Sequence, residues 1–365
     1  MCKSPLHALL TSMPKCEHHL HLEGTLSCEL LFSLAEANTI PLPSGPEFAS
    51  PAALRARYAA FTSLDDFLAY YYIGFSVLLT ASDFEQLTYA YLSRAAHENV
   101  RHAEIFFDPQ GHTSRGVSVS AIVEGFQAAA KRAAQEFRIT ALLIPCLLRH
   151  LPVADSKACF ESLVAAGHFD ARKGGEAEPG FAGLGLCSTE LSQPPAHWAE
   201  IFAAAKSKGI RRTVHAGEEG PARYVAAALA DLGAMRIDHG VRAAEDDAVI
   251  EKLAEQGVLV TVCPVSNVCL RVAKSVAESP LSVFVDKGVK FSLNSDDPAY
   301  FGDHYIQDVY CAVEEAFGFS IEQWAKIVRD AVDGSWCTEE RKAVIREEID
   351  GGYCYGKLQG ILRAF

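Results

Sequence analysis

The sequence predicts an α/β fold in which eight parallel strands close into a (β/α)8 TIM-type barrel. Three observations favour this fold. Short apolar runs alternate with longer segments of helical periodicity, eight such runs can be counted, and several end in polar residues that can carry chemistry. A chain of 365 residues is long for an ordinary domain but matches the size of one barrel. We therefore expect a single domain over residues 1–365.

The expected strands are rich in Val, Ile, Leu and Phe, as strands covered on both faces must be. They are Lys15–Leu22, Arg101–Phe107, Ile139–Leu148, Phe181–Leu186, Arg212–His215, Arg236–His239, Val258–Cys263 and Val289–Leu293. The helices expected between them include Asp83–Glu98, Ser120–Glu136, Pro195–Lys208 and Asp246–Gln256. An open dinucleotide-binding sheet would need a glycine-rich turn after its first strand, whereas this strand is followed by Glu23-Gly24-Thr25.

Extra helices are expected between strands one and two and at the C-terminus. The segment Asp65–Leu79 is either a core helix or a lid over the barrel mouth, and the tail from Trp336 to Phe365 has no evident role. Loops are expected at Pro41–Pro51 and Arg172–Gly180, where Gly, Pro or charged residues cluster.

Composition limits the partners of the protein. The formal net charge is −13, so nucleic acid and anionic membranes are not expected to bind, and a small neutral or cationic ligand fits better. Eleven scattered cysteines and a start without a signal-peptide pattern indicate a reduced, intracellular chain. We expect a cytoplasmic location, with the nucleus as an alternative. The apolar run Ala141–Leu148 is too short to cross a bilayer.

Residues suited to metal binding lie at the carboxyl ends of the expected strands, where barrel enzymes place their active sites. His19 and His21 share one face of the first strand because side chains alternate along it. The other strand ends carry His215, Glu218, His239, Asp296 and Asp297. Three histidines and an aspartate would suit Zn²⁺ with an open position for water.

Each of these motifs also has an ordinary structural explanation. Glu218 could simply follow a strand in a capped helix start, and the pair Asp296 and Asp297 could form a helix cap. The pair His102 and Glu104 matches half of a cytidine-type deaminase signature, but no Pro-Cys-x-x-Cys follows. We interpret those two residues as structural or as support for the residues that bind the metal.

With these motifs in order, the chain resembles the adenosine/adenine deaminase family of metal-dependent amidohydrolase barrels. The motifs are Pro14-Lys15, Glu17-His18-His19-Leu20-His21-Leu22-Glu23-Gly24, His215-Ala216-Gly217-Glu218, Arg236-Ile237-Asp238-His239-Gly240, Cys263-Pro264 with Ser266-Asn267, and Ser292 to Pro298. Phe106 to Thr113 and Gly185 to Glu190 are most like its adenine-specific branch. Glu23 and Ser188 add bulk where adenosine-specific relatives usually carry Asp and Gly, which favours a free base over a nucleoside.

The resemblance implies hydrolytic deamination of adenine to hypoxanthine and ammonia, a step of purine salvage, with one Zn²⁺ per chain. His19, His21, His215 and Asp296 would bind the metal. His239 and Asp296 would position the attacking water, and Glu218 would protonate purine N1. Asp297 would accept a hydrogen bond from N7–H, while Ser188, Glu23 and Gly24 would line the N3/N9 edge. The expected partner is a small purine, and the sequence predicts no oligomeric state.

Other substrates and functions stay open at this stage. Adenosine or an N6-substituted AMP could be the substrate, with Arg115, Arg149 and Arg223 as candidate phosphate ligands. A catalytically silent purine-binding barrel is a remote alternative, although Glu218 and His239 are both present. A two-metal site would need a bridging lysine at the fourth strand, where the chain has Cys187-Ser188-Thr189-Glu190.

Three departures from the family pattern accompany the resemblance. Cys187 replaces the usual Asp, Thr189 replaces the usual Ser, and Ser279 stands where a His is common. The first two change the bracing of the fourth strand end.

Overall fold

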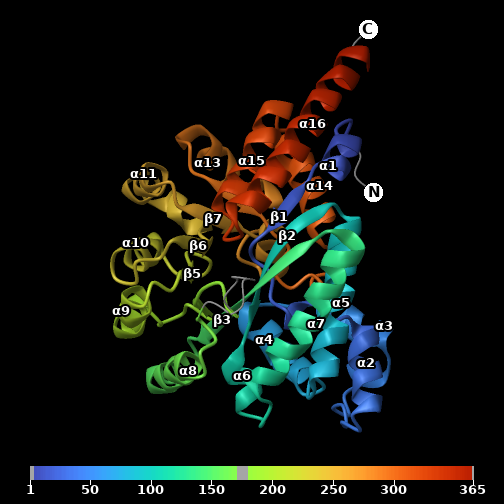
Figure 1. Ribbon diagram of the computed structural model, residues 1–365, viewed down its shortest axis with the longest axis vertical. Helices are drawn as coiled ribbons and strands as arrows, with labels where there is room; N and C mark the ends of the chain where they lie inside the picture. The colour runs from blue at the N-terminus through green and yellow to red at the C-terminus, as the bar shows by residue number, and fades with distance from the viewer. Residues whose placement is uncertain (1–3, 171–179, 364–365) are drawn as a thin grey trace.

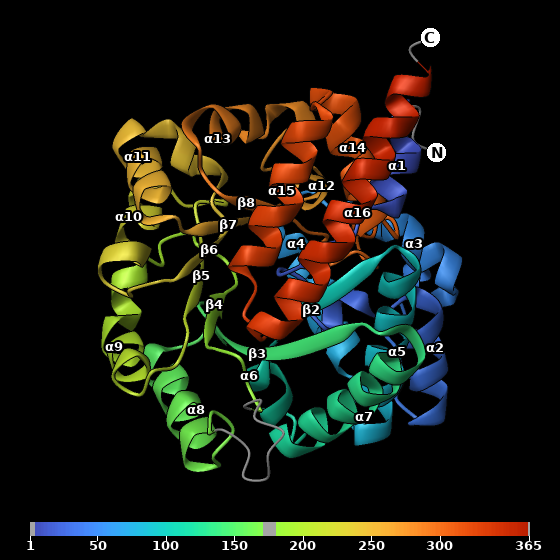
Figure 2. The same ribbon diagram turned by 45° about the horizontal axis from the view of Figure 1, so that its top comes forward.

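Eight short parallel strands form the centre of the molecule in the computed structural model, which describes residues 4–170 and 180–363 and the side chains up to residue 351 (Figures 1 and 2). They are β1 (Lys15–Glu17), β2 (Val100–Phe107), β3 (Thr140–Leu148), β4 (Gly185–Cys187), β5 (Thr213–Ala216), β6 (Arg236–His239), β7 (Leu259–Val262) and β8 (Phe291–Leu293). They pair in the orders β1-β2-β3-β4 and β5-β6-β7-β8. Parallel bridges join Leu184 to Arg212 and Leu20 to Asp296, so the ring closes.

The predicted barrel is therefore confirmed, and every expected strand has a counterpart. The first one is shorter than expected, because it ends at Glu17 rather than Leu22. His18 N donates to the Asn294 side chain (2.8 Å) instead of a neighbouring strand, and only isolated bridges at Leu20 and His21 continue the pairing. This break turns the histidine segment into the barrel mouth.

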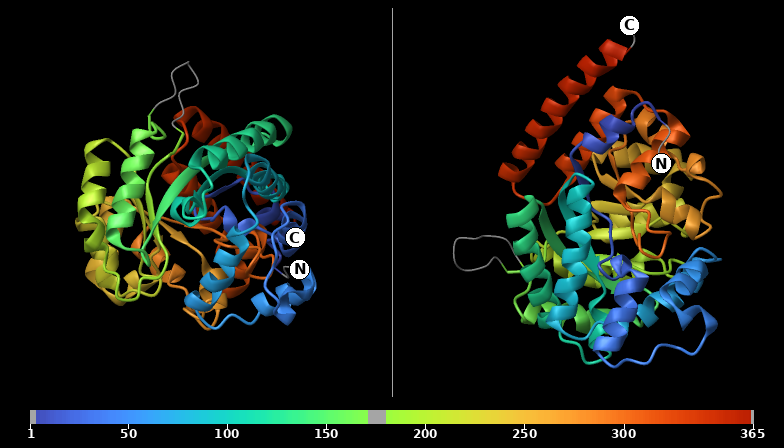
Figure 3. Two further views of the ribbon diagram at one scale, coloured as in Figure 1. Left: turned by 90° about the horizontal axis from the view of Figure 1, so that it is seen from below. Right: turned by 90° about the vertical axis from the view of Figure 1, so that its right-hand side faces the viewer.

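Helices surround the ring of strands in all views (Figures 2 and 3). They are α1 (His7–Ser12), α2 (Cys28–Ala37), α3 (Pro51–Tyr58), α4 (Leu64–Phe75), α5 (Ala81–His97), α6 (Pro109–Thr113), α7 (Val119–Phe137), α8 (Val153–Ala165), α9 (Ala199–Ser207), α10 (Ala222–Ala230), α11 (Asp247–Gln256), α12 (Pro264–Cys269), α13 (Leu281–Lys287), α14 (Ile306–Phe317), α15 (Ile321–Gly334) and α16 (Glu339–Arg363).

The four helices expected from periodicity are present as α5, α7, α9 with a preceding 3₁₀ turn, and α11. The expected loop 41–51 contains a short 3₁₀ turn, Pro46–Ala49, before α3 begins. The expected loop 172–180 lies outside the described residues except for Gly180. No helix in the described part of the chain has the length and apolar character needed to cross a membrane.

The C-terminal helices pack against the amino-terminal end of the barrel, and α16 then extends away from it (Figure 3). Arg236 pairs with Glu104 inside the barrel (2.7 Å), and the Trp336 backbone N–H also donates to Glu104. Burial alone would raise the pKa of Glu104, but the charge of Arg236 holds that pKa below its usual value. Glu104 thus pairs with Arg236, which begins β6, and also lies 3.3 Å from His102 Nε2. This buried group is separate from the cluster of His19, His21 and His215.

Candidate active site

A cavity opens at the carboxyl ends of the strands, beneath helix α4. The space between its lining residues, together with the part open to solvent, amounts to about 400 Å³. One side is lined by Leu64, Phe67, Leu68, Tyr71 and Tyr72 of α4 together with Leu270. The other side is lined by His21, Asp108, Cys187, Ser188, His215, Glu218, His239, Asp296 and Asp297. Seven of the ten site residues predicted from the sequence lie on this wall; Glu23, Gly24 and His19 are the exceptions.

Helix α4 covers the cavity and is anchored by aromatic contacts. The Phe67 ring packs against Phe301 (5.2 Å between centroids), and Tyr71 packs edge-on against Tyr300 (5.7 Å). The sequence predicts either a core helix or a lid for this segment. The helix is in fact packed into the core through its buried face, and the same face covers the cavity.

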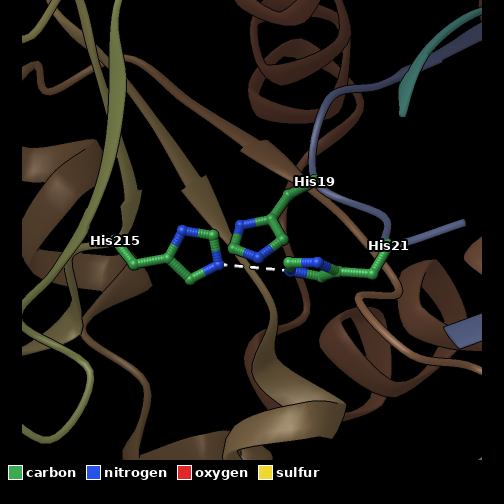
Figure 4. A group of neighbouring side chains, drawn as sticks. All are labelled: His19, His21 and His215. Carbon is green, nitrogen blue, oxygen red and sulfur yellow. Dashed lines mark hydrogen bonds between the residues drawn. The ribbon is translucent and has the colours of Figure 1, made fainter. Parts of the chain in front are cut away.

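Three imidazoles meet at the centre of the barrel mouth, two from the segment that follows β1 and one from β5 (Figure 4). One ring nitrogen each from His19, His21 and His215 lies within 4.8 Å of the others. His21 Nε2 and His215 Nε2 are 3.3 Å apart. Asp296 Oδ1 lies 3.4 Å from His19 Nε2 and 3.6 Å from His21 Nε2. The four residues proposed as metal ligands are thus brought together and buried.

Hydrogen bonds set which ring nitrogen of each histidine faces this point. Thr261 Oγ1 donates to Asp238 Oδ1 (2.9 Å), so it accepts from His19 Nδ1 (3.0 Å). His215 Nδ1 lies 3.3 Å from Asp238 Oδ2, which favours a proton on that nitrogen too. With Nδ1 protonated in each neutral ring, the unprotonated Nε2 atoms are the ones turned toward the centre.

This donor set fits a divalent metal ion. His19 Nε2 is buried and has no hydrogen-bond partner among the described residues. Two nitrogens that bind one tetrahedral Zn²⁺ at about 2.0–2.1 Å lie roughly 3.3 Å apart, close to the His21–His215 separation. Imidazole nitrogens and a carboxylate that converge on one buried point are a donor set suited to such an ion.

Asp296 and His239 are held at the mouth in uncommon backbone conformations. Their φ angles are 66° and 62°, in the left-handed region that non-glycine residues rarely adopt. Ser266 Oγ donates to Asp296 Oδ2 (2.6 Å). Asn267 Nδ2 donates to His239 Nδ1 (3.3 Å), which places the proton of a neutral ring on Nε2, 3.8 Å from Asp296 Oδ2.

Glu218 is fixed through its backbone, and its carboxyl is left free. Glu190 accepts hydrogen bonds from Gly217 N (2.9 Å) and Glu218 N (2.8 Å), and Gly217 turns the chain at a φ of 79°. Glu218 Oε2 lies 3.5 Å from His239 Nε2, while Oε1 is buried without a partner among the described residues. Burial, reinforced by the charge of Asp296, raises the pKa of Glu218 well above its usual value.

Asp297 lines the cavity next to Asp296, with its Oδ1 buried and unpartnered among the described residues. Gly24 lies directly beneath it, and a Cβ at that position would stand 2.0 Å from Asp297 Oδ1. The absence of a side chain at Gly24 therefore makes room for Asp297. In this way Gly24 contributes to the site without lining it.

Ser188 and Glu23 are engaged with protein groups. Ser188 lines the cavity, and its Oγ is 2.7 Å from His150 Nδ1. Glu23 does not line it, because its Oε1 accepts from His112 Nε2 (2.7 Å) and from the Asp108 backbone N–H (3.2 Å). Contact of these two residues with the substrate stays a prediction.

Sequence reasoning missed several members of the site. Asp238 and Glu190 stand inside the motifs given above, but no local pattern predicts that Asp238 contacts His215 or that Glu190 binds the backbone at Glu218. Thr261 gave no signal because it lies within an otherwise apolar strand. Asp108 was noticed only as part of its run, and the structure places it in the cavity wall.

The arginines considered as phosphate ligands lie elsewhere. Arg149 is buried and donates to the His215 carbonyl (2.5 Å), and Arg115 donates to the Gly111 carbonyl (3.2 Å). Arg223 lies over the Tyr224 ring. Among the described residues, the lining of the cavity contains no Lys or Arg.

Comparison with known proteins agrees with this geometry. A family model described as adenosine deaminase matches residues 14–351. The adenine deaminase of Gibberella zeae is 52% identical over 342 residues, which cover 94% of this chain and 95% of that protein. That of Schizosaccharomyces pombe is 46% identical over 344 residues, with 94% and 91% covered.

Solved structures show the same similarity. An adenine deaminase from Arthrobacter aurescens has a TM-score of 0.85 at 40% identity, covering 93% of this chain and 98% of that one. An amidohydrolase from Burkholderia ambifaria with bound zinc has a TM-score of 0.82 at 27% identity, covering 100% and 98%. The chain therefore belongs to the adenosine deaminase family.

Proposed function

We propose that this protein is a hydrolase that converts adenine to hypoxanthine and ammonia, with one Zn²⁺ per chain. The observation that carries the proposal is a buried, unpartnered Glu218 carboxyl beside His239, at the edge of the three-histidine group. Relatives named adenine deaminases, 46–52% identical over more than nine tenths of the chain, support adenine as the substrate.

The metal would be held by His19, His21, His215 and Asp296, whose donor atoms converge. When bound, it polarises water so that the pKa of that water falls toward neutrality. His239 Nε2 and Asp296 Oδ2 face the same point and would orient the oxygen that attacks purine C6.

Glu218 would act as the proton donor to ring N1 while C6 becomes tetrahedral. This role needs a carboxyl group that is neutral at the working pH, and the burial of Glu218 favours that form. The C6–N bond then breaks and the amino group leaves as ammonia. Asp297 would hold the N7 side of the ring, and the aromatic residues of α4 would cover its face.

A free base suits the cavity better than a nucleotide. A phosphate would need a cationic partner, and the described lining has none. The silent-barrel alternative would require a missing catalytic group, whereas Glu218 and His239 are both in place. These two features favour a working deaminase over a nucleotide deaminase and a silent barrel, and the adenine deaminases among the relatives favour adenine over adenosine.

The test is ammonia release from adenine, adenosine and N6-methyl-AMP by metal-replete protein, with Glu218→Gln beside it. We expect release from adenine, and a loss of roughly 10²–10⁴-fold in kcat for Glu218→Gln with its metal retained. Glu251→Gln, on the exposed face of α11, is the matched control and should keep full activity. Normal turnover by Glu218→Gln would rule out its proposed role.

A further inference from the structure

Asp108 occupies an unusual position at the start of α6. It stands at the N-cap of that helix, where an aspartate ordinarily accepts a hydrogen bond from a backbone N–H of the first turn. The Asp108 side chain makes no such bond. It lines the cavity instead, although the residue is only 2% exposed.

One oxygen of this carboxyl is fixed and the other is open. Cys187 Sγ, at the end of β4, donates to Asp108 Oδ1 (3.4 Å). Oδ2 has no hydrogen-bond partner among the described residues. Cys187, which stands where the family usually has an Asp, therefore orients the Asp108 carboxyl. This hydrogen bond links the end of β4 to the start of α6.

The neighbouring polar groups are already occupied. Glu23 is bonded to His112 and to the Asp108 backbone, and Ser188 Oγ is 2.7 Å from His150. Glu218 and Asp297 lie with Asp296 at the metal end. Asp108 is thus the carboxyl with a free oxygen on the wall that Cys187 and Ser188 form.

A free purine base and its nucleoside differ at one edge. The base can carry an N–H at N9, whereas a nucleoside carries a sugar there. Asp108, Cys187 and Ser188 line the same cavity as the proposed metal ligands, and Asp108 and Cys187 lie next to His21. If C6 lies at the metal, these residues are candidates to meet the N3/N9 edge of the base. A buried acceptor there rejects ligands without the donor, because its own hydrogen bond is then lost.

We propose that Asp108 determines specificity for the free base by accepting a hydrogen bond from purine N9–H, with Cys187 as its positioning residue. The neutral base carries one proton on its five-membered ring, so in this binding mode the proton lies on N9 and N7 is an acceptor, in place of the N7–H contact expected for Asp297. The inference rests on the proposed function, since it assumes that adenine binds with C6 at the metal. It assigns to Asp108 the contact that Glu23 and Ser188 are not free to make.

The experiment compares kcat/KM for adenine, 7-methyladenine and 9-methyladenine in the wild type and in Asp108→Leu, which keeps the branched shape of the side chain but removes the acceptor. The wild type should prefer adenine over 9-methyladenine by about 10⁴-fold or more. In Asp108→Leu the value for adenine should fall at least 10²-fold, mainly through KM. The values for 9-methyladenine and 7-methyladenine should each change less than threefold, because neither base carries an N9–H. The preference for adenine over both should therefore fall together with the adenine value.

Metal content and two further variants keep the result interpretable. Asp108→Asn retains an oxygen acceptor and should keep more of the preference than Asp108→Leu. If Asp108→Leu fails to fold, a preference in Asp108→Asn and Asp108→Ala equal to the wild type would overturn the inference. Asp308→Asn is the matched control, because the Asp308 side chain lies on the exposed side of α14.

Two results would count against Asp108 alone. An equal loss for adenine and 9-methyladenine would indicate a structural role. A loss of bound metal would instead place Asp108 with the metal ligands, since its carboxyl, His21 and Cys187 lie within 4.8 Å of one another. By contrast, no ammonia from adenine with the unmodified protein would refute the proposed function itself.

Discussion

His21 and His215 face each other through their Nε2 atoms at 3.3 Å, although they come from opposite sides of the barrel mouth. His215 Nδ1 is directed to Asp238, so its Nε2 carries a lone pair toward His21. A proton on His21 Nε2 allows the hydrogen bond drawn in Figure 4, and a metal ion bound to both nitrogens would replace that proton.

Metal removal should accordingly destabilise the protein. A ligand that binds only the folded chain adds about 4 kcal/mol at a free concentration of 1,000 times its Kd. We expect a chelator to lower Tm by several degrees, and His215→Ala to lose metal and activity together. His197→Ala, an exposed histidine, is the control. A full metal equivalent in His215→Ala would exclude it as a ligand.

Thr261 should control metal affinity without touching the metal. Its hydroxyl accepts from His19 and donates to Asp238, so it holds the His19 tautomer. Thr261→Val keeps the shape but removes the hydroxyl, and we expect metal affinity to fall about 10–100-fold. Competition with a chromophoric chelator measures this. Thr261→Ser should restore most of the affinity, and equal affinity in Thr261→Val would show that the hydroxyl has no part in it.

Gly24→Ala should impair catalysis while the metal stays bound. The new Cβ would stand 2.0 Å from Asp297 Oδ1 and 2.7 Å from Asp297 Cα, so the backbone itself must move. A displacement of about 1 Å at a positioning group costs on the order of 10²-fold in rate. Gly351→Ala, a helical glycine with open space around it, is the matched control and should be neutral. Full activity in Gly24→Ala would mean that Asp297 tolerates displacement.

The sequence predicted the barrel well because buried strands and amphipathic helices leave periodic patterns. It also located the histidines and acids, since strand ends in a barrel converge. It did not reveal the break after Glu17, which depends on the side chain of Asn294, just after the neighbouring strand β8, accepting from His18 N. The turn of Asp108 away from its helix cap and the link through Thr261 likewise depend on tertiary contacts that no local pattern encodes.

The first part of helix α16 should contribute to stability. Ile345 on this helix is fully buried, whereas its neighbour Val344 is 46% exposed. We expect Ile345→Ala to cost about 2–5 kcal/mol of unfolding free energy and Val344→Ala less than about 0.5 kcal/mol. Urea unfolding monitored by fluorescence measures both. Similar small effects would mean that the tail from Trp336 is an appendage to the barrel, rather than part of the single domain predicted from the sequence.

Lys15 should make stability depend on pH. The side chain is fully buried and donates to the carbonyls of Met13 (3.1 Å) and Glu98 (3.0 Å). Burial lowers the pKa of Lys15 from 10.5 to about 7. Between these two values the unfolded chain binds more protons at Lys15 than the folded chain, so this residue makes the fold more stable as pH rises.

The measurement is the free energy of unfolding of the wild type minus that of Lys15→Met, from pH 7 to 9.5. This difference should rise by up to about 1.4 kcal/mol per pH unit, because over this range the unfolded chain holds a proton on Lys15 that the folded chain has lost. Lys208→Met is the matched control: Lys208 is exposed, so its side chain meets water in both states and the difference should stay flat. A flat profile for Lys15→Met as well would mean that the Lys15 ammonium keeps its proton inside the fold, stabilised there by the two carbonyls.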